Sequence, residues 1–96
     1  MVWEEFVVTK CLVLDKKDNV AVSMAPVKAG DQVDFSGGEN VVAIDEVPFA
    51  HKIAIKSIPR GARVYKYGEV IGEATEDISA GQHVHVHNIR SLRVRR

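Results

Sequence analysis

A short turn pattern that occurs three times constrains the fold more than any other feature of the chain. An aliphatic residue, two further residues, a glycine, two more residues and a valine occupy positions 27–33, 58–64 and 78–84. We expect the first aliphatic residue to anchor each segment in a core, the glycine to adopt a positive-φ turn and the valine to begin a strand. The glycines lie 31 and then 20 residues apart, which is too uneven for a solenoid repeat.

The segments between these turns are short and rich in β-branched and apolar residues. They predict strands at 7–14, 20–24, 41–44, 49–55 and 64–74, with the first two paired as a hairpin and the last interrupted by a turn at Gly68. No window of helical length has a 3.6-residue period without Gly or Pro. The sequence therefore predicts a mainly β domain, barrel-like or clip-like, with little helix.

The size and charge of the chain restrict its function. With 96 residues, we expect a single domain, 1–96, whose active site would be a surface groove or would be shared with another subunit. Lys plus Arg and Asp plus Glu number 13 each, so no net charge favours nucleic acid or an anionic membrane. No apolar run approaches the length of a membrane span, and residues 1–5 do not begin a signal peptide. A cytoplasmic protein is the expectation.

Two further features have simple interpretations. Cys11 is the one cysteine, so no disulfide can form within the chain, and its apolar neighbours predict a buried side chain. Arginines crowd the end of the chain, at positions 90, 93, 95 and 96. Such a tail is either solvated, a docking arm for a partner or an anion contact.

Three of the four histidines alternate near the end of the chain, at His83, His85 and His87. In an extended strand they share one face, and Val84 and Val86 point the other way, toward a core. Two imidazoles at i and i+2 lie about 6.5–7 Å apart along the backbone, close enough to share one metal ion. His51 or a partner chain would complete such a site. Imidazole suits zinc, iron, nickel and copper alike, so the ligands do not identify the metal.

Acid–base chemistry is the other interpretation of this segment. Proton abstraction beside a carboxylate needs a base, a cation that holds the acid and a group that stabilises the developing negative charge. His85 or His87 could be the base, Lys52 or Arg90 could hold a carboxylate, and Asn88 could donate a hydrogen bond. No phosphate loop, Ser-His-Asp set or nucleotide fingerprint accompanies them. Metal ligation, acid–base or anion contact, and an inert surface all remain open.

Three segments, 51–54, 67–72 and 81–88, resemble, in this order along the chain, the N-terminal region of the altronate/galactarate dehydratase family. Residues 18–22 also resemble that family's opening strand pair, and the three glycine turns are similar to those of the wider SAF domain group, whose fold is a β-clip. The resemblance covers about Asp18 to Ser91. One departure is Ala50, because the family usually has Gly before His51.

The resemblance implies a division of labour between this chain and a larger one. In the altronate dehydratases, the similar region is fused to a large catalytic region, whereas in the related sulfolactate sulfo-lyase it is a separate small subunit. These lyases remove water from a sugar acid or sulfite from 3-sulfolactate, and the family is associated with iron. The chain is therefore expected to be the small subunit or N-terminal domain of a lyase. Its expected partner is a large catalytic subunit of the same family, which holds most of the iron or other divalent metal site.

The resemblance and the alternating histidines His83, His85 and His87, here called the histidine ladder, together suggest roles for individual residues. His85 and His87 are expected to be catalytic or to bind a metal that is shared with the partner. The residues expected to contact the hydroxy-acid substrate are His51, Lys52, Asn88 and Arg90. Two other classes compete with this prediction, a non-catalytic SAF binding module and a stand-alone metal-binding protein. Homo-oligomerisation is also left open.

Overall fold

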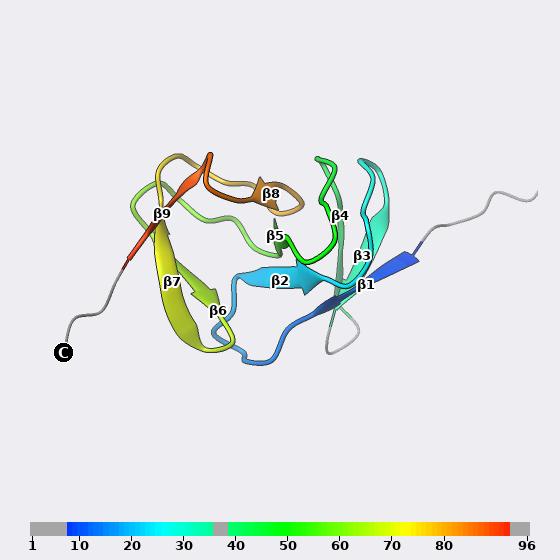
Figure 1. Ribbon diagram of the computed structural model, residues 1–96, viewed down its shortest axis with the longest axis horizontal. Helices are drawn as coiled ribbons and strands as arrows, with labels where there is room; N and C mark the ends of the chain where they lie inside the picture. The colour runs from blue at the N-terminus through cyan, green and yellow to red at the C-terminus, as the bar shows by residue number, and fades with distance from the viewer. Residues whose placement is uncertain (1–7, 36–38, 93–96) are drawn as a thin grey trace, which may run out of the picture.

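Nine short strands joined by turns form the part of the chain that the structure describes, which is residues 8–35 and 39–92 of a computed structural model (Figure 1). The larger sheet has the strand order β4 (Glu39–Val42), β3 (Gln32–Phe35), β1 (Val8–Leu12), β2 (Val20–Ser23), β5 (Lys52–Ala54) and β8 (His83–Val84). The smaller sheet has the order β6 (Arg63–Lys66), β7 (Glu69–Ala74) and β9 (Ile89–Ser91). Among the described residues no helix forms, and hence none that could cross a membrane. The predicted mainly β fold is confirmed.

Most of the neighbouring strands run antiparallel. Within the described strands, β1 and β3 are the one parallel pair, with Thr9 opposite Val33. The predicted hairpin of β1 and β2 is confirmed, with Cys11 opposite Ser23. The predicted turn at Gly68 is confirmed too, since it joins the antiparallel strands β6 and β7.

The glycine turn occurs four times in the structure, once more than the sequence pattern indicates. The turns occupy 27–30, 47–50, 58–61 and 78–81. They meet in pairs through antiparallel bridges, Val27 with Val47 and Ile58 with Ile78. The additional turn, 47–50, does not match the sequence pattern because Ala50 occupies the position of the glycine. Its φ is 67°, so this alanine adopts the left-handed conformation that glycine has in the other three turns.

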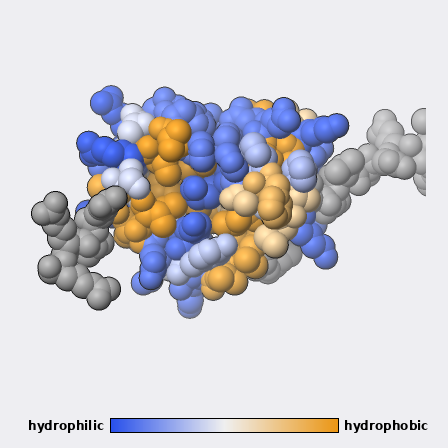
Figure 2. Space-filling model, in the orientation of Figure 1, coloured by the Kyte–Doolittle hydropathy of each residue, from blue (hydrophilic) through white to orange (hydrophobic). Residues whose placement is uncertain are grey.

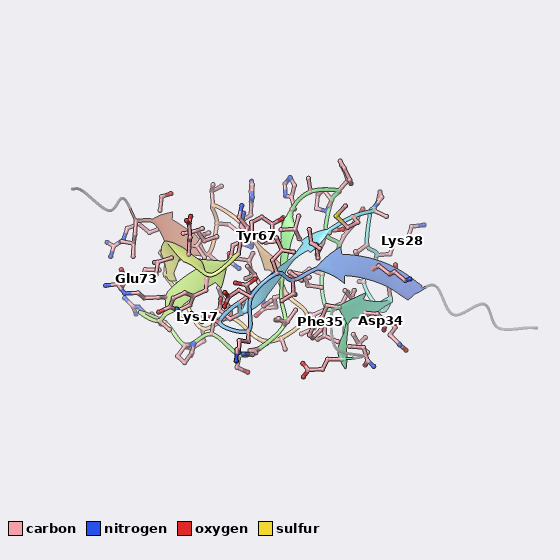
Figure 3. The ribbon with its side chains drawn as sticks, turned by 90° about the horizontal axis from the view of Figure 1, so that it is seen from below. Lys17, Lys28, Asp34, Phe35, Tyr67 and Glu73 are labelled. Carbon is pink, nitrogen blue, oxygen red and sulfur yellow. The ribbon has the colours of Figure 1, made fainter. Side chains whose placement is uncertain are left out.

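The two pairs of turns belong to two similar halves of the chain, related by a shift of 31 residues. The hydrogen bond from Gly30 N to Ala43 O, 2.7 Å long, has its counterpart in the bond from Gly61 N to Ala74 O, 2.8 Å. Each half has its own apolar cluster. Figure 3 shows the halves end to end, with Lys28 toward one end of the described part of the molecule and Glu73 toward the other.

Five pairs of residues related by the shift of 31 build most of the two cores. The first core consists of Cys11, Ala21, Val27, Val33, Ala43, Val47 and Ile53. The second core consists of Val20, Ala54, Ile58, Val64, Ala74, Ile78 and Val84. Strand β5 serves both, because Ile53 belongs to the first and Ala54 to the second, and both are fully buried. The predicted burial of Cys11 is confirmed, and burial raises the pKa of its thiol.

Asp18 and Asn19 join the first half to the β6–β7 hairpin. The buried Asp18 carboxylate accepts a 2.8 Å hydrogen bond from Gly68 N. The Asn19 side chain donates to Arg63 O at 2.9 Å and accepts from Tyr65 N at 2.8 Å. A buried carboxylate without such donors would strongly destabilise the fold. These contacts give the Asp18-Asn19 segment a structural role.

Some strand predictions need correction. The strand expected at 49–55 is limited to Lys52–Ala54, because the turn ending at Ala50 precedes it. Phe49 therefore does not share a strand face with Ile53, and its side chain is 61% exposed. The strand expected at 41–44 is found at Glu39–Val42. The tail arginines at 93, 95 and 96 lie outside the described residues.

Candidate functional site

The pairing of β5 with β8 brings distant histidines onto one face. These strands run antiparallel, with Ile53 opposite His83 and Lys52 opposite Val84. Continuing this register places His51 opposite His85. Because alternate residues of a strand and directly opposite residues of a pair share a face, His51, His83 and His85 lie together. Val84 points to the other side and is fully buried in the second core.

The imidazole rings are in direct contact. Nδ1 of His51 lies 2.9 Å from Nε2 of His83. The ring centroids of His51 and His85 are 4.3 Å apart, and those of His83 and His85 are 5.5 Å apart, both stacked. One ligand nitrogen from each of these three residues lies within 4.8 Å of the others. His87 is exposed and meets the cluster through His83, at 5.3 Å between centroids.

The chain turns immediately after β8, so the expected extended ladder ends at Val84. Val86 is 81% exposed, and the prediction that it faces a core is wrong. The physical reason is Asn88, which is fully buried and folds the turn back on itself. Its amide donates to His83 O at 2.9 Å, and its carbonyl accepts from His85 N at 3.0 Å. Asn88 thereby fixes the backbone that carries the histidines.

Burial and neighbouring positive charge favour neutral imidazoles. Burial lowers the pKa of His83, and charge on His51, His87 and His85 lowers it further, against a smaller opposing effect of the Asp45 carboxylate. Partial desolvation lowers the pKa of His85, with added effects of His51, Lys52 and His87. At neutral pH these two side chains are therefore unprotonated, which is the form that accepts a proton or binds a metal.

The other residues expected at the site are placed differently. Lys52 is half-buried and acts electrostatically on His85, and burial followed by the charge of Lys66 lowers its pKa. Arg90 lies on β9, where its guanidinium pairs with Glu73 at 2.6 Å. The Asn88 amide is already used within the chain. The structure thus gathers His51, His85 and His87 around His83. Lys52 lies on the opposite face of β5, across from Val84, and acts on His85 by its charge, whereas Arg90 is directed toward Glu73.

Two residues of the cluster were not among the expected site residues. His83 contacts all three other histidines. Its place in the alternating pattern was the signal that could have identified it as a site residue. Asp45 accepts a 3.1 Å hydrogen bond from His83 N, from 38 residues away. Nothing in the local sequence marks Asp45, because its position depends on the packing of the 47–50 turn.

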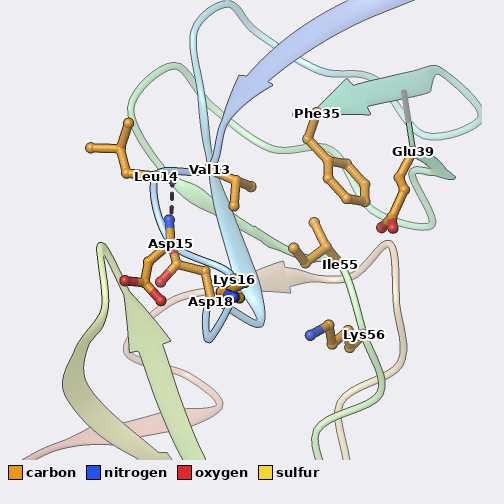
Figure 4. A pocket seen from close by; sticks show the side chains of 9 residues that line it. All are labelled: Val13, Leu14, Asp15, Lys16, Asp18, Phe35, Glu39, Ile55 and Lys56. Carbon is orange, nitrogen blue, oxygen red and sulfur yellow. Dashed lines mark hydrogen bonds between the residues drawn. The ribbon is translucent and has the colours of Figure 1, made fainter. Parts of the chain in front are cut away.

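A pocket of about 360 Å³ lies at the other end of β5, away from the histidines (Figure 4). Phe35 and Ile55 face each other across it, and Lys56 lies at its rim. Its buried acidic residue, Asp18, is occupied by backbone donors. The histidines instead lie on and next to β8 and at the entry to β5, and Figure 2 shows a largely hydrophilic upper surface in the region where Figure 1 places β8. Since the reactive side chains gather at β5 and β8, we regard the histidine cluster as the candidate site.

Comparison with known proteins gives one matching family model. The model describes the altronate/galactarate dehydratase SAF domain and matches residues 9–92. An altronate dehydratase of Bacillus subtilis (strain 168) is 36% identical over 78 residues, which cover 81% of this chain and 16% of that protein. An altronate dehydratase of Escherichia coli (strain K12) is 45% identical over 74 residues, 77% of this chain and 15% of that protein.

A shorter relative is matched over almost its whole length. The (2R)-sulfolactate sulfo-lyase subunit alpha of Paracoccus pantotrophus is 37% identical over 70 residues, which cover 73% of this chain and 98% of that subunit. The chain thus corresponds to about one sixth of the altronate dehydratases and to nearly all of this lyase subunit.

Proposed function

The chain belongs to the altronate/galactarate dehydratase SAF domain family, and on that premise we propose that it is the small subunit or N-terminal domain of a cytoplasmic hydro-lyase that dehydrates a sugar acid such as altronate. The catalytic core of this enzyme is on a larger partner. Relatives named altronate dehydratase support the reaction class, and a relative named as a subunit supports the division between chains.

The single observation that carries the proposal is the open cluster of histidines, with the charge of Lys52 within electrostatic range of His85. Elimination of water requires a base that removes the proton next to the substrate carboxylate. His85 is suited to this role, since its lowered pKa leaves it unprotonated at neutral pH. The charge of Lys52, which acts on His85 from the opposite face of β5, attracts the carboxylate. Protonation of the leaving hydroxyl is a task for the partner in this proposal.

The other histidines have supporting roles in this proposal. The exposed His87 reaches toward the partner or the substrate, and His51 holds His85 in place by stacking. Asn88 acts indirectly, by shaping the turn that carries both His85 and His87. Arg90 can take part only if its guanidinium leaves Glu73, so it ranks last.

The surface around the cluster supports a protein partner. Ile44, Phe49 and Val86 are 54%, 61% and 81% exposed; Ile44 and Val86 are next to Asp45 and His85 in the sequence, and Phe49 is two residues before His51. Exposed apolar side chains near polar reactive groups are typical of a surface that another protein covers. Docking there would also exclude water from the histidines.

A metal belongs to the proposal, because the family resemblance implies iron or another divalent ion. Such an ion would polarise the substrate oxygen atoms, and most of its ligands would come from the large partner. Imidazole donors are compatible with iron. The alternating histidines suggested His85 and His87 as the donors, whereas the ring nitrogens that come within 4.8 Å of one another belong to His51, His83 and His85.

A second candidate is the small subunit of a sulfolactate sulfo-lyase. The specific observation in its favour is that the match covers 98% of such a subunit. The same base and cation would serve, but a carbon–sulfur bond would break and sulfite would leave. The choice between these substrates depends on the pocket of the large partner.

Co-purification with a large subunit of the same family tests the proposal. The tagged chain is co-expressed with that subunit, and the complex is assayed for water loss from altronate and for sulfite release from sulfolactate, with each chain alone as the control. We expect a stable complex that turns over one of the two. A complex that turns over neither, or no complex at all, would instead indicate a non-catalytic binding module.

A further inference from the structure

We propose that this chain by itself binds one divalent transition-metal ion through His51, His83 and His85. This site differs from the His85–His87 pair that the alternation of the ladder suggests. It needs no partner chain, and it is tested separately from the proposed lyase function, in which an uncoordinated His85 acts as the base.

The distances place the three donors almost at coordination geometry. A metal–imidazole bond is about 2.0–2.1 Å long, so donors at angles between 90° and 109° lie about 2.8–3.4 Å apart. His51 Nδ1 and His83 Nε2 are 2.9 Å apart, and all three donor atoms fall within 4.8 Å. A small rotation of the His85 ring would close the remaining gap. The three side chains are half-buried, which limits their freedom before binding.

Hydrogen bonds of the backbone hold all three ligand residues in place. His83 is in β8, where its N–H also donates to Asp45, and His85 N donates to the buried Asn88 side chain. His51 N donates to Pro48 O at 3.1 Å at the entry to β5. Three side chains on two paired strands thus converge without any rearrangement of the strands. A preorganised set of ligands loses less entropy on binding than a flexible one.

The donor chemistry indicates which ions fit. Three imidazoles favour zinc, cobalt, nickel, copper and iron over magnesium or calcium, which prefer oxygen ligands. Three histidine ligands also leave a coordination position open for water, substrate or a partner's side chain. The Asp45 carboxylate adds a nearby negative charge that favours a cation.

His87 provides the matched control. It belongs to the same ladder and lies 5.3 Å from His83 between ring centroids, but its ring nitrogens are not part of the converging group. If the alternating pattern alone made the site, loss of His87 would weaken binding as much as loss of His85. If the cross-strand group makes it, His51 matters and His87 does not.

The 96-residue chain, freed of metal with EDTA and dialysed, is titrated with Co²⁺, and the visible d–d absorption is recorded; Zn²⁺ is then titrated by calorimetry. We expect one ion per chain. Loss of a residue that only hydrogen-bonds to a metal ligand weakens affinity about 10–100-fold, so His51→Ala, His83→Ala and His85→Ala should each weaken it at least that much. His87→Ala should remain within about twofold of the unaltered chain.

Circular dichroism of each variant shows whether it is folded, and His83→Gln replaces His83→Ala if the latter is not. Absence of Co²⁺ and Zn²⁺ binding to the folded, unaltered chain would overturn the proposal. Equal losses in His85→Ala and His87→Ala with none in His51→Ala would also overturn it, since the ladder pair would then be the site. Lyase activity is not measured, so failure here leaves the proposed function standing.

Discussion

Nδ1 of His51 lies 2.9 Å from Nε2 of His83, although 32 residues separate them in the chain. The antiparallel pairing of β5 with β8 causes this contact, because its register places both residues on one face. The same pairing connects the site to the fold, since Ile53 and Val84 of these strands are fully buried in the two cores. A change that shifts the register of β8 would therefore disperse the histidines.

The stability of the metal-free chain should depend on the protonation of His83. Its pKa is lowered on folding, relative to about 6.5 for an unfolded histidine, so below that pH the unfolded chain binds more protons than the folded one. The free energy of unfolding should therefore fall as the pH decreases from about 7.5 to 5.5. The groups that face His83 are His51, His85, His87 and Asp45.

Urea denaturation in EDTA at several pH values measures this effect. The His83→Gln variant should show a weaker decline toward acidic pH, because one proton-binding group of the unfolded state has been removed. A free energy of unfolding that rises on acidification would contradict the account of the cluster.

Replacing Ala50 by Gly should stabilise the fold. Ala50 has a φ of 67°, and the left-handed conformation costs a non-glycine residue about 1–2 kcal/mol. Glycine also adds entropy to the unfolded chain, so we expect a net gain of about 0.5–1 kcal/mol. Ala29→Gly, at an exposed turn residue outside the positive-φ set, is the control and should destabilise the chain instead. Chemical denaturation compares the two, and a loss of stability in Ala50→Gly would refute the strain argument.

Alanine substitutions at Gly81 and Gly30 allow the effect of backbone strain to be distinguished from the effect of close packing. Both have positive φ, but a Cβ at Gly30 meets nothing within 4 Å, whereas one at Gly81 would collide with the carbonyl oxygen of Val42. Gly30→Ala should cost about 0.5–1 kcal/mol, because the loss of unfolded-state entropy partly offsets the backbone strain. Gly81→Ala should cost about 2–4 kcal/mol, because overpacking adds about 1–3 kcal/mol.

The steric collision in Gly81→Ala should also change the environment of the histidine cluster. Ile44 N donates to Gly81 O at 2.8 Å, and the adjacent Asp45 accepts from His83 N. In folded Gly81→Ala protein, the imidazole NMR signals of His83 should shift, while those in Gly30→Ala stay in place. Equal destabilisation by the two substitutions would show that packing at Gly81 is unimportant.

The sequence was sufficient for the features that depend on local physics. The glycine turns and the β-branched segments predicted the strands because positive φ and alternating burial leave clear local patterns. The fourth turn was missed because it has Ala50 in place of the glycine that defines the pattern. The correspondence between the two halves was missed for the same reason, because recognising it requires both turns of each pair.

The site was predictable only in part. Alternation identified His83, His85 and His87 as neighbours on one face, and His51 was predicted as one way to complete a metal site with them. The bend after Val84 was missed because it depends on the burial of Asn88, which is a tertiary feature. Asp45 was missed for the same reason, and Arg90 was assigned a role without knowledge of its pairing with Glu73.

The turnover number of the assembled lyase with His85→Gln tests the central claim most directly. Lys56→Ala, at the opposite end of β5, is the control, and size-exclusion chromatography confirms that each complex forms. Because a positioned acid–base residue contributes about 10²–10⁴-fold, kcat should fall by that factor in His85→Gln and stay unchanged in Lys56→Ala. An intact His85→Gln complex with undiminished kcat would contradict the account.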